Sequence, residues 1–241
     1  MGAKTAILAY IDGNAGQQLG RSERLTVEVA RQLVNRIHPD RPAEQLPDAT
    51  LADEVWPSDD HTYVAAFAGV YLVCDQRFAV ERPSQLAPHL FDLAAGRRVL
   101  LHTMHSGSDA LAIGVWEAGQ LRRALGVRSG TVVENVGPLL PFEAPYWRHH
   151  DADGETTSVP IRPLDLGEAA LRAWFGFALE GEISRNQIDP DDIPVYGFRT
   201  ADPTGAEQAT RQALLEQFRR THTLRRYSMG PDGTLVEIID A

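Results

Sequence analysis

The sequence has a single cysteine, Cys74, so no disulfide bond can form within the chain. Because structural disulfides occur mainly in oxidising compartments, this scarcity favours a reducing, cytoplasmic setting. Long hydrophobic runs are also missing, and no stretch approaches the roughly 18 apolar residues of a membrane-spanning helix. The N-terminal run in MGAKTAILAYIDGN is too short and too β-like for a secretory signal peptide. We therefore expect a cytoplasmic protein without a membrane partner.

Positive charge is scarce as well. The chain has 23 Lys and Arg against 33 Asp and Glu, which gives a net charge of −10. Proteins that hold nucleic acid neutralise its phosphates with a surplus of Lys and Arg. A small molecule or another protein is therefore a better expected partner than nucleic acid. No motif identifies a cofactor.

The pattern of apolar residues predicts an α+β fold. With 241 residues, of which 43% are hydrophobic, the chain is large enough to bury one core. Apolar or alternating runs predict strands, and 3.6-residue periodicity with capping signals predicts helices. The strands are expected at 6–11, 62–74 (broken at Gly69), 98–104, 111–117, 121–127, 194–199, 224–229 and 235–239, and the helices at 22–37, 83–95, 165–179 and 204–220. We expect a single domain over residues 1–241, with a mixed but largely antiparallel sheet and helices packed on it.

Five phrases of the sequence, taken together, resemble a known family. They are GAKTAILAYIDGN, LHTMHS, GVWEAGQLRRALGV, NVGPLLPFEAPYW and LRAWFGFALEG. They are similar to an actinobacterial family of uncharacterised proteins, catalogued as domain of unknown function 6928. The resemblance covers about residues 2–181 and leaves 182–241 as a helix–hairpin extension. It implies one domain in a bacterial cytoplasm, and it implies no catalytic residue.

A first candidate site follows the first expected strand, at Asp12 and Asn14. Carboxylates beside glycine turns at strand ends hold hard cations or phosphate, because oxygen ligands and exposed amides meet there. The alternative is an ordinary strand-ending turn, in which Asp and Asn bond to the backbone.

A second candidate is the run His102-Thr-Met-His105-Ser-Gly-Ser-Asp109. Side chains three apart on a strand point to opposite faces, so the two histidines do not form a metal pair unless a bulge intervenes. We expect one of them to be a hydrogen-bonded core residue and the other a loop residue. His105, at the strand end, is the candidate acid–base with Asp109 as its partner.

The third candidate is GPLLPFEAPYWRHHD, residues 137–151, which we call the strap. Its prolines fix the backbone, so its aromatic residues either cap the core or line a pocket as ligand-binding groups. A carboxylate within an aromatic run must pair, cap amides or act on a ligand. We expect no metal at the histidines, because adjacent side chains diverge. The strap residues in question are Glu143, Tyr146, Trp147, His149, His150 and Asp151.

Two hypotheses about function follow. The first is a non-catalytic binding or protein-interaction protein, which the lack of any complete catalytic motif favours. The second is a small hydrolase or transferase that uses His105 with Asp109 or Glu143, and Asp12 with Asn14 as an anion or metal position. The second requires these residues to meet in one concave site. Cys74 is expected to be buried and inert, since nothing local lowers its pKa.

Overall fold

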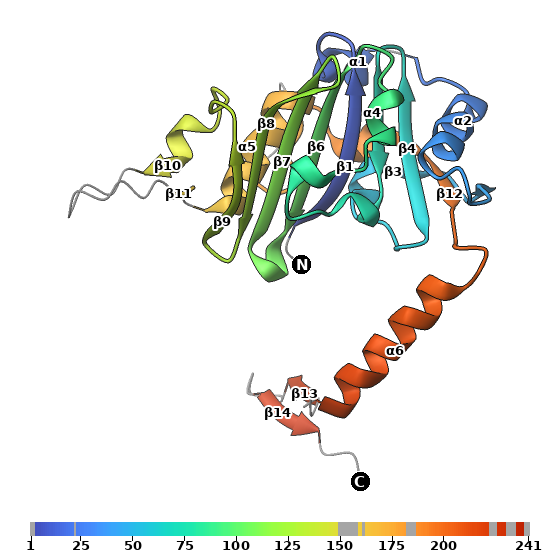
Figure 1. Ribbon diagram of the computed structural model, residues 1–241, viewed down its shortest axis with the longest axis vertical. Helices are drawn as coiled ribbons and strands as arrows, with labels where there is room; N and C mark the ends of the chain where they lie inside the picture. Colours follow the sequence, from blue (N-terminus) through green and yellow to red (C-terminus); the bar gives the residue numbers. More distant parts are fainter. Residues whose placement is uncertain are drawn as a thin grey trace. The chain divides into compact units, whose positions relative to one another are not determined.

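The computed structural model describes residues 3–21, 23–148, 159–160, 162–181, 187–221, 226–229 and 235–238. The chain divides into two compact units, residues 1–200 and residues 201–241. The first unit carries one large sheet with helices on both faces (Figure 1). No helix in the described part of the chain is long and apolar enough to cross a membrane.

Every pairing in the large sheet is antiparallel, which confirms the α+β prediction with a largely antiparallel sheet. The strands lie in the order β2-β12-β4-β5-β1-β6-β7-β8-β9, and β3 also pairs with β12. Their bounds are β1 Lys4–Ile11, β2 Glu44–Gln45, β3 Ala49–Thr50, β4 His61–Phe67, β5 Val70–Cys74, β6 Arg98–His105, β7 Ala110–Glu117, β8 Gln120–Arg128, β9 Thr131–Val136 and β12 Pro194–Arg199.

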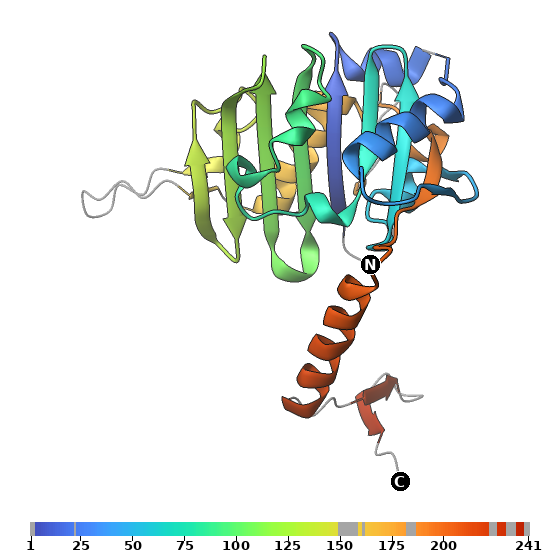
Figure 2. The ribbon, with the colours of Figure 1, turned by 45° about the vertical axis from the view of Figure 1, so that its right-hand side comes forward.

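The central strand β1 is apolar and buried on both faces because helices cover both. On one face α2 (Val27–Ile37) and the single turn α4 (His89–Asp92) pack on residues such as Leu8 and Tyr10. On the other face α5 (Pro163–Phe175) packs with α1 (Ala15–Arg21), against Ile7 and Ala9. Figure 2 shows α2 in front of the sheet and the helix α5 behind it. The sheet is therefore the middle layer of three.

The expected strands are found with small shifts, and the expected hairpin at Ala118-Gly119 joins β7 to β8. The strand β9 was not predicted. Its sequence TVVENV lies at the sheet edge, where its residues are half-buried or exposed, so it lacks a strong alternating pattern.

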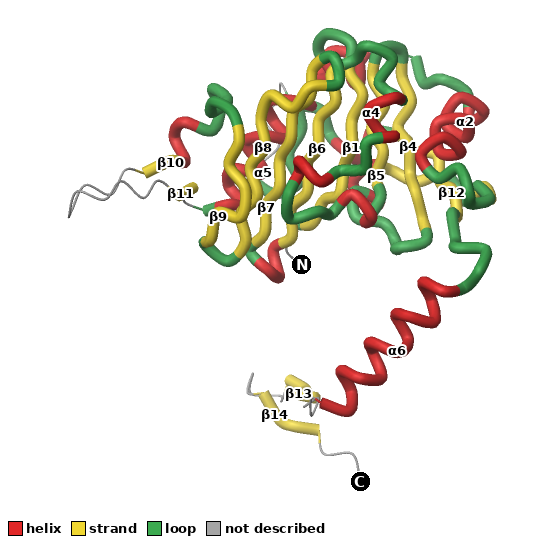
Figure 3. The backbone as a smooth tube through the Cα atoms, viewed as in Figure 1, coloured by secondary structure: helices red, strands yellow, loops and turns green. Residues whose placement is uncertain are grey.

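The helices differ more from expectation. The helix expected at 22–37 begins only at Val27, while α1 was not predicted at all. The segment 83–95 forms a 3₁₀ turn (Pro83–Gln85) and the four-residue α4, and not one continuous helix. Figure 3 shows α4 as a short helical turn between stretches of loop. The helix expected at 165–179 runs from Pro163 to Phe175, where Gly176 adopts a left-handed conformation (φ 80°) and ends it.

The second unit contains α6 (Ala206–Thr221) and a hairpin of β13 (Arg226–Met229) with β14 (Leu235–Ile238), as expected. The expected extension, however, started at residue 182. The first unit instead continues to Thr200, because β12 pairs with β2, β3 and β4 and closes one side of the sheet.

Two buried side chains inside the sheet match the sequence-based expectation. Cys74 is fully buried, and burial raises the pKa of its thiol, so the residue is inert. His102 is also fully buried; its Nδ1 lies 2.8 Å from Thr5 Oγ1 and its Nε2 lies 2.9 Å from the carbonyl oxygen of Gly167. Because a carbonyl only accepts, Nε2 carries the proton and the Thr5 hydroxyl donates to Nδ1. His102 therefore ties β1 and β6 to α5 as a neutral ring.

This neutral ring makes stability depend on pH. Burial, partly offset by the bond to Gly167, lowers the pKa of His102 from 6.5 to about 4. Only the unfolded chain binds this proton between pH 6.5 and 4, so the wild type loses about 3 kcal/mol of unfolding free energy across that window. We expect His102→Gln to lack this loss, so its deficit relative to wild type shrinks by that amount on acidification. Urea titrations at several pH values measure the deficit.

The matched control is His61→Gln, the same change at a partly exposed histidine. The pH dependence assigned to His102 is the part that His61→Gln does not share. A deficit of His102→Gln that does not shrink would contradict the neutral-ring assignment.

Candidate functional site

A cavity of about 190 Å³ lies where β6 ends and β7 begins. We call it the His105 cavity. Thr103 and His105 are two apart on β6 and so face the same side of the sheet, with Ala112 and Ala110 as their cross-strand partners on β7. The small alanine side chains leave space above the sheet. Residues that line the cavity include Trp56, Thr103, His105, Ser108, Ala112 and Arg128.

The polar groups of the cavity come from β6 and the turn after it. The ring of His105 packs edge-on against Trp56, with 5.3 Å between ring centroids. Its Nδ1 lies 3.3 Å from Ser108 Oγ, and its Nε2 has no hydrogen-bond partner among the described residues. Thr103 is only 6% exposed, and its hydroxyl also has no partner in the described part of the chain. The cavity thus contains hydrogen-bonding groups that the protein leaves unused.

Asp109 does not join this set. It adopts a left-handed conformation (φ 43°) in the turn between β6 and β7, where its carbonyl oxygen accepts a bond from the Ser129 amide at 3.0 Å. The partner of His105 is Ser108, and Asp109 is not among the residues that line the cavity. The structure therefore gives Asp109 a turn-forming role and does not place it as the orienting group of His105.

Asp12 and Asn14 lie at the opposite end of β1 from His105. In the register of β1 with β6, Lys4 pairs with His105 and Ile11 pairs with Arg98. The Asp12 carboxylate is paired with Arg97 Nε at 2.8 Å and is more than half exposed. Asn14 Oδ1 accepts the Gln17 amide at 3.0 Å, in the manner of a helix cap for α1. Asp12 and Asn14 thus lie in an ordinary strand-ending turn, and the helix α1 follows directly after it.

Glu143 is an internal ion-pair partner. It is fully buried, and Arg123 on β8 donates to both of its oxygens, from Nε at 2.9 Å and from Nη2 at 2.6 Å. One oxygen also accepts the Leu140 amide at 3.1 Å. Arg123 Nη1 meanwhile bonds to Asn135 Oδ1 at 2.6 Å. Glu143 therefore ties the strap to the sheet, does not line the His105 cavity, and has both oxygens bonded within the protein.

The aromatic residues of the strap pack on the α5 face. Phe142, Tyr146 and Trp147 lie beside the apolar cluster of β6, β7, β8 and α5, and Phe142 meets Trp174 edge-on at 5.5 Å. They cap the edge of the core and do not line the His105 cavity. His149, His150 and Asp151, the end of the strap, lie outside the described residues.

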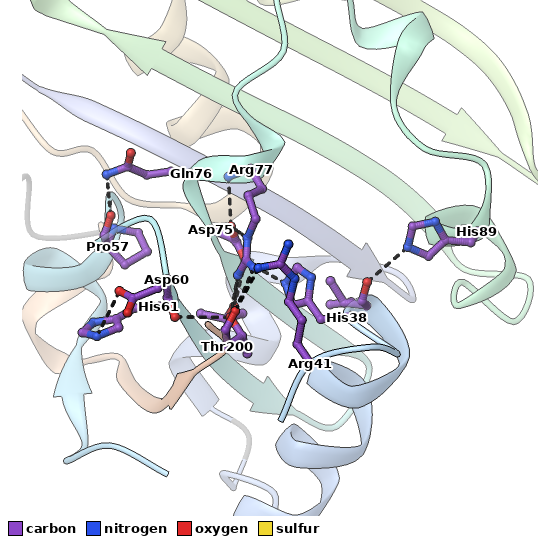
Figure 4. Close-up of polar contacts among 12 residues, drawn as sticks. His38, Arg41, Pro57, Asp60, His61, Asp75, Gln76, Arg77, His89 and Thr200 are labelled. Atoms are coloured by element: carbon purple, nitrogen blue, oxygen red, sulfur yellow. Dashed lines mark hydrogen bonds and ion pairs between the residues drawn. The ribbon is translucent and has the colours of Figure 1, made fainter. Parts of the chain in front are cut away.

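Sequence reasoning missed a buried polar network centred on Asp75, the residue after β5 (Figure 4). The carboxylate is fully buried and accepts five bonds. Arg77 gives three of them, from its amide and from Nε and Nη2, at 2.6–2.9 Å. Thr62 Oγ1 gives one at 2.7 Å and His38 Nε2 gives one at 2.9 Å. Arg77 also bonds to Thr200, so the network joins α2, β4, β5 and the end of β12.

The bonds of this network fix its protonation. Burial raises the pKa of Asp75, but the bonds from His38 and Arg77 and the Arg77 charge outweigh it and lower the pKa to about 2. Burial lowers the pKa of His38, an effect that its bond to Asp75 only partly offsets. His38 is therefore a neutral ring that donates from Nε2. An aspartate directly after an apolar run was the available signal, but apart from Arg77 its partners Thr62 and His38 are 13 and 37 residues away in the sequence.

A histidine–aspartate pair of this kind can serve as a general base, but none of the described residues around the hollow beside His38 is a serine, threonine or cysteine nucleophile. His38 lines a hollow of about 660 Å³ with Arg36, Asp92 and other residues of α2 and α4. Its carboxylate partner faces inward, where every bond goes to the protein. The network is therefore best described as an internal tie between the helix α2 and the sheet.

The described residues contain no group of three or more His, Cys, Asp or Glu that is arranged to hold a metal ion. An acidic hollow of about 850 Å³ lies next to the His105 cavity, and Trp56 borders both. Its carboxylates have local partners: Asp53 accepts the Thr50 hydroxyl, Asp189 accepts the Asp191 amide and Glu180 accepts the Ala3 amide. These bonds account for the acidic cluster without a ligand.

The ion pair of the strap predicts a large cost for Glu143→Ala. The change leaves the Arg123 guanidinium, only 1% exposed, without its carboxylate, and about 3 kcal/mol or more of unfolding free energy is expected to be lost. Glu117→Ala is the matched control, because Glu117 pairs with Arg122 in the open and should cost less than about 1 kcal/mol. Urea denaturation measures both. An unchanged stability of Glu143→Ala would mean that the carboxylate serves a ligand.

The Asp75 network predicts a distinct pH signature. The pKa of Asp75 is lower in the folded protein than in the unfolded chain. The ionised carboxylate therefore adds to the unfolding free energy above about pH 4, and this contribution is lost as the pH falls toward 2. Asp75→Asn should therefore cost about 3 kcal/mol at neutral pH and progressively less below pH 4. Thr62→Val removes no charge, although its hydroxyl donates to Asp75 and also bonds to Arg77 and Thr200, so its cost, about 1 kcal/mol or more, should change with pH less than that of Asp75→Asn. A cost of Asp75→Asn that is constant down to pH 2.5 would contradict this assignment.

Comparison with known proteins bears on the whole first unit. No curated protein and no solved structure matches the chain. The model of a family of unknown function, DUF6928, matches residues 5–198, which covers β1 through β12 and most of the chain. The resemblance inferred from the five sequence phrases is thereby confirmed, and the matched region ends with the sheet and not at residue 181. The chain belongs to the family of unknown function DUF6928.

Proposed function

We propose that this protein is a non-catalytic binding protein whose small-molecule ligand occupies the His105 cavity. The observation that carries the proposal is Thr103, which lines the cavity, is 6% exposed as a residue, and has a hydroxyl without a partner among the described residues. Its oxygen is not sealed inside the protein, so the hydroxyl is accessible from the cavity and available to a ligand. The free Nε2 of His105, two residues further along the same strand face, points to the same conclusion.

Binding is favoured over catalysis by what surrounds His105. Acid–base catalysis with a serine nucleophile needs a third group that orients the imidazole ring. Ser108 meets His105 at 3.3 Å, which is long for a hydrogen bond, and no carboxylate of the described residues bonds to the ring. The hydrolase alternative drew on Asp109, Glu143 and Asp12, which lie in a turn, in an internal ion pair and at the far end of β1. It has no assembled site to support it.

The size of the cavity and the charge of the chain favour a small molecule over a macromolecule. A volume of about 190 Å³ exceeds the roughly 150 Å³ cavity that accepts benzene. The net charge of −10 counts against nucleic acid. Largely apolar walls with a few convergent polar groups are typical of small-molecule sites.

Filling the cavity tests this function. Ala112 is 3% exposed, lines the cavity, and is paired across the sheet with Thr103 of β6 and Gly126 of β8. Ala112→Leu should occupy part of the space and change stability by no more than about 1 kcal/mol. We expect wild-type protein to bind benzene, detected by saturation-transfer NMR and by a rise in the unfolding temperature, and the variant to bind it at least tenfold more weakly.

Ala209→Leu, an exposed change on α6, is the matched control and should leave benzene binding unchanged. Absence of benzene binding to the wild-type protein, with no effect of Ala112→Leu, would remove the support for a binding cavity.

A further inference from the structure

We infer that the ligand of the His105 cavity is a small uncharged molecule, largely apolar, that carries one hydrogen-bonding group at one end. The inference rests on the proposed function, since it takes the cavity as a binding site. Three properties of the cavity define this class: the distribution of its polar groups, the balance of its charges and its volume.

The polar groups of the cavity are concentrated on one wall. Thr103 and His105 project from the same face of β6, roughly 7 Å apart along the strand. The rest of the lining is largely apolar and includes Ala79 and Val80 of the loop before the 3₁₀ turn and Ala112 of β7. A ligand in this space can satisfy hydrogen bonds at one end only, and the rest of it must be apolar. Because a hydroxyl both donates and accepts, the complementary group is a hydroxyl, a carbonyl or an amide.

The charged residues of the cavity neutralise each other. Arg128 and Glu81 line the cavity and form an ion pair, and both side chains are 55% exposed. A carboxylate ligand would have to compete with Glu81 for Arg128, and an ammonium ligand would have to compete with Arg128 for Glu81. Desolvating a charged group without a free counter-ion is costly, so the lining selects against ions of either sign.

The floor of the cavity limits the size of the ligand. The Glu81 carbonyl oxygen lies so close to Gly126 that a Cβ there would sit 2.1 Å away, so the loop that forms one wall rests directly on the sheet backbone. Trp56 forms another wall, held by its edge-on contact with His105. A volume of about 190 Å³ between them suits roughly ten non-hydrogen atoms, on the scale of phenol or a small aromatic alcohol.

The main alternative to an uncharged ligand is a cation, because an acidic hollow lies next to the His105 cavity. It contains Asp53, Glu180, Asp189 and Asp191 against Lys4, and it shares Trp56 with the His105 cavity. An organic amine that spans both spaces would place its charge there. Because those carboxylates already have local partners, we favour the uncharged ligand, and the amine is an outcome that the test below distinguishes.

The test compares four probes of similar shape: phenol, benzene, benzoate and benzylamine. Binding to the full chain is measured by calorimetry and by the shift in unfolding temperature. We expect phenol to bind at least tenfold more tightly than benzoate or benzylamine. In Thr103→Val, which keeps the side-chain shape but lacks the hydroxyl, phenol affinity should fall about tenfold while benzene affinity stays within twofold. Thr103→Ser, which retains the hydroxyl, should restore phenol binding.

Thr103→Val also separates a ligand role from a structural one. Without ligand, its unfolding temperature should equal or exceed that of the wild type, because no bond within the described protein is lost. A lower unfolding temperature would overturn the inference by showing that the hydroxyl serves the fold. Equal binding of phenol and benzene, with no effect of Thr103→Val, would also overturn it but would leave the binding function standing. Tightest binding of benzylamine or benzoate would replace the uncharged class. Failure of all four probes would count against the proposed function itself.

Discussion

The structure depends on how the first strand satisfies its backbone hydrogen bonds. β1 is buried on both faces, so each of its peptide groups needs a protein partner. β6 pairs with its whole length, but β5 reaches only as far as Ile7. Beyond that point the Ala6 amide donates to Val55, and the Ala6 carbonyl accepts from the Asp75 amide. The chain around Val55 therefore replaces a strand, and this brings the next residue, Trp56, against His105. The incomplete pairing of β1 thus supplies one wall of the His105 cavity, Trp56.

The two buried carboxylates connect distant parts of the chain in the same way. Glu143 holds the strap to β8, and Asp75 holds the end of α2 to β4, β5 and the residue after β12. Buried ion pairs add little net stability compared with apolar packing, because desolvation offsets most of their attraction. These two pairs instead favour one arrangement of the chain. Each carboxylate accepts bonds from particular donors, so a different placement of the strap or of α2 would leave a buried charge unpaired.

The sequence predicted the elements whose pattern is local. The strands β1, β4, β5, β6, β7, β8 and β12 are apolar runs bounded by turns, and each was recognised. Helix α1 escaped because its seven residues are too few to show a period, and the helix expected at 83–95 was wrong in length, since only Pro83–Gln85 and His89–Asp92 are helical there. The edge strand β9 escaped because its half-exposed residues do not alternate.

The site was less predictable, since its geometry comes from contacts distant in sequence. His105 was identified from its place at a strand end, and the structure does put it on a cavity. Its neighbour Trp56 is 49 residues earlier in the chain and arrives there through the gap beside β1. Thr103 was passed over, because a threonine in a strand is ordinary and only its missing partner marks it. Glu143 was rightly singled out as a carboxylate that needs a partner, but nothing local indicated that Arg123 would be that partner.

The single buried thiol, Cys74, allows opening of the sheet to be followed chemically. Cys74 lies in β5 with Ile7 of β1 on one side and Tyr63 of β4 on the other, and it is completely shielded from solvent. A thiol reagent can reach it only when the strands separate or when the residues packed over that face of the sheet, such as Leu51 and Val55, move away. Since the sequence has no second cysteine, any labelling signal comes from this one place. The rate at which a thiol reagent labels Cys74 therefore measures transient opening at the middle of the sheet, and no engineered cysteine is needed.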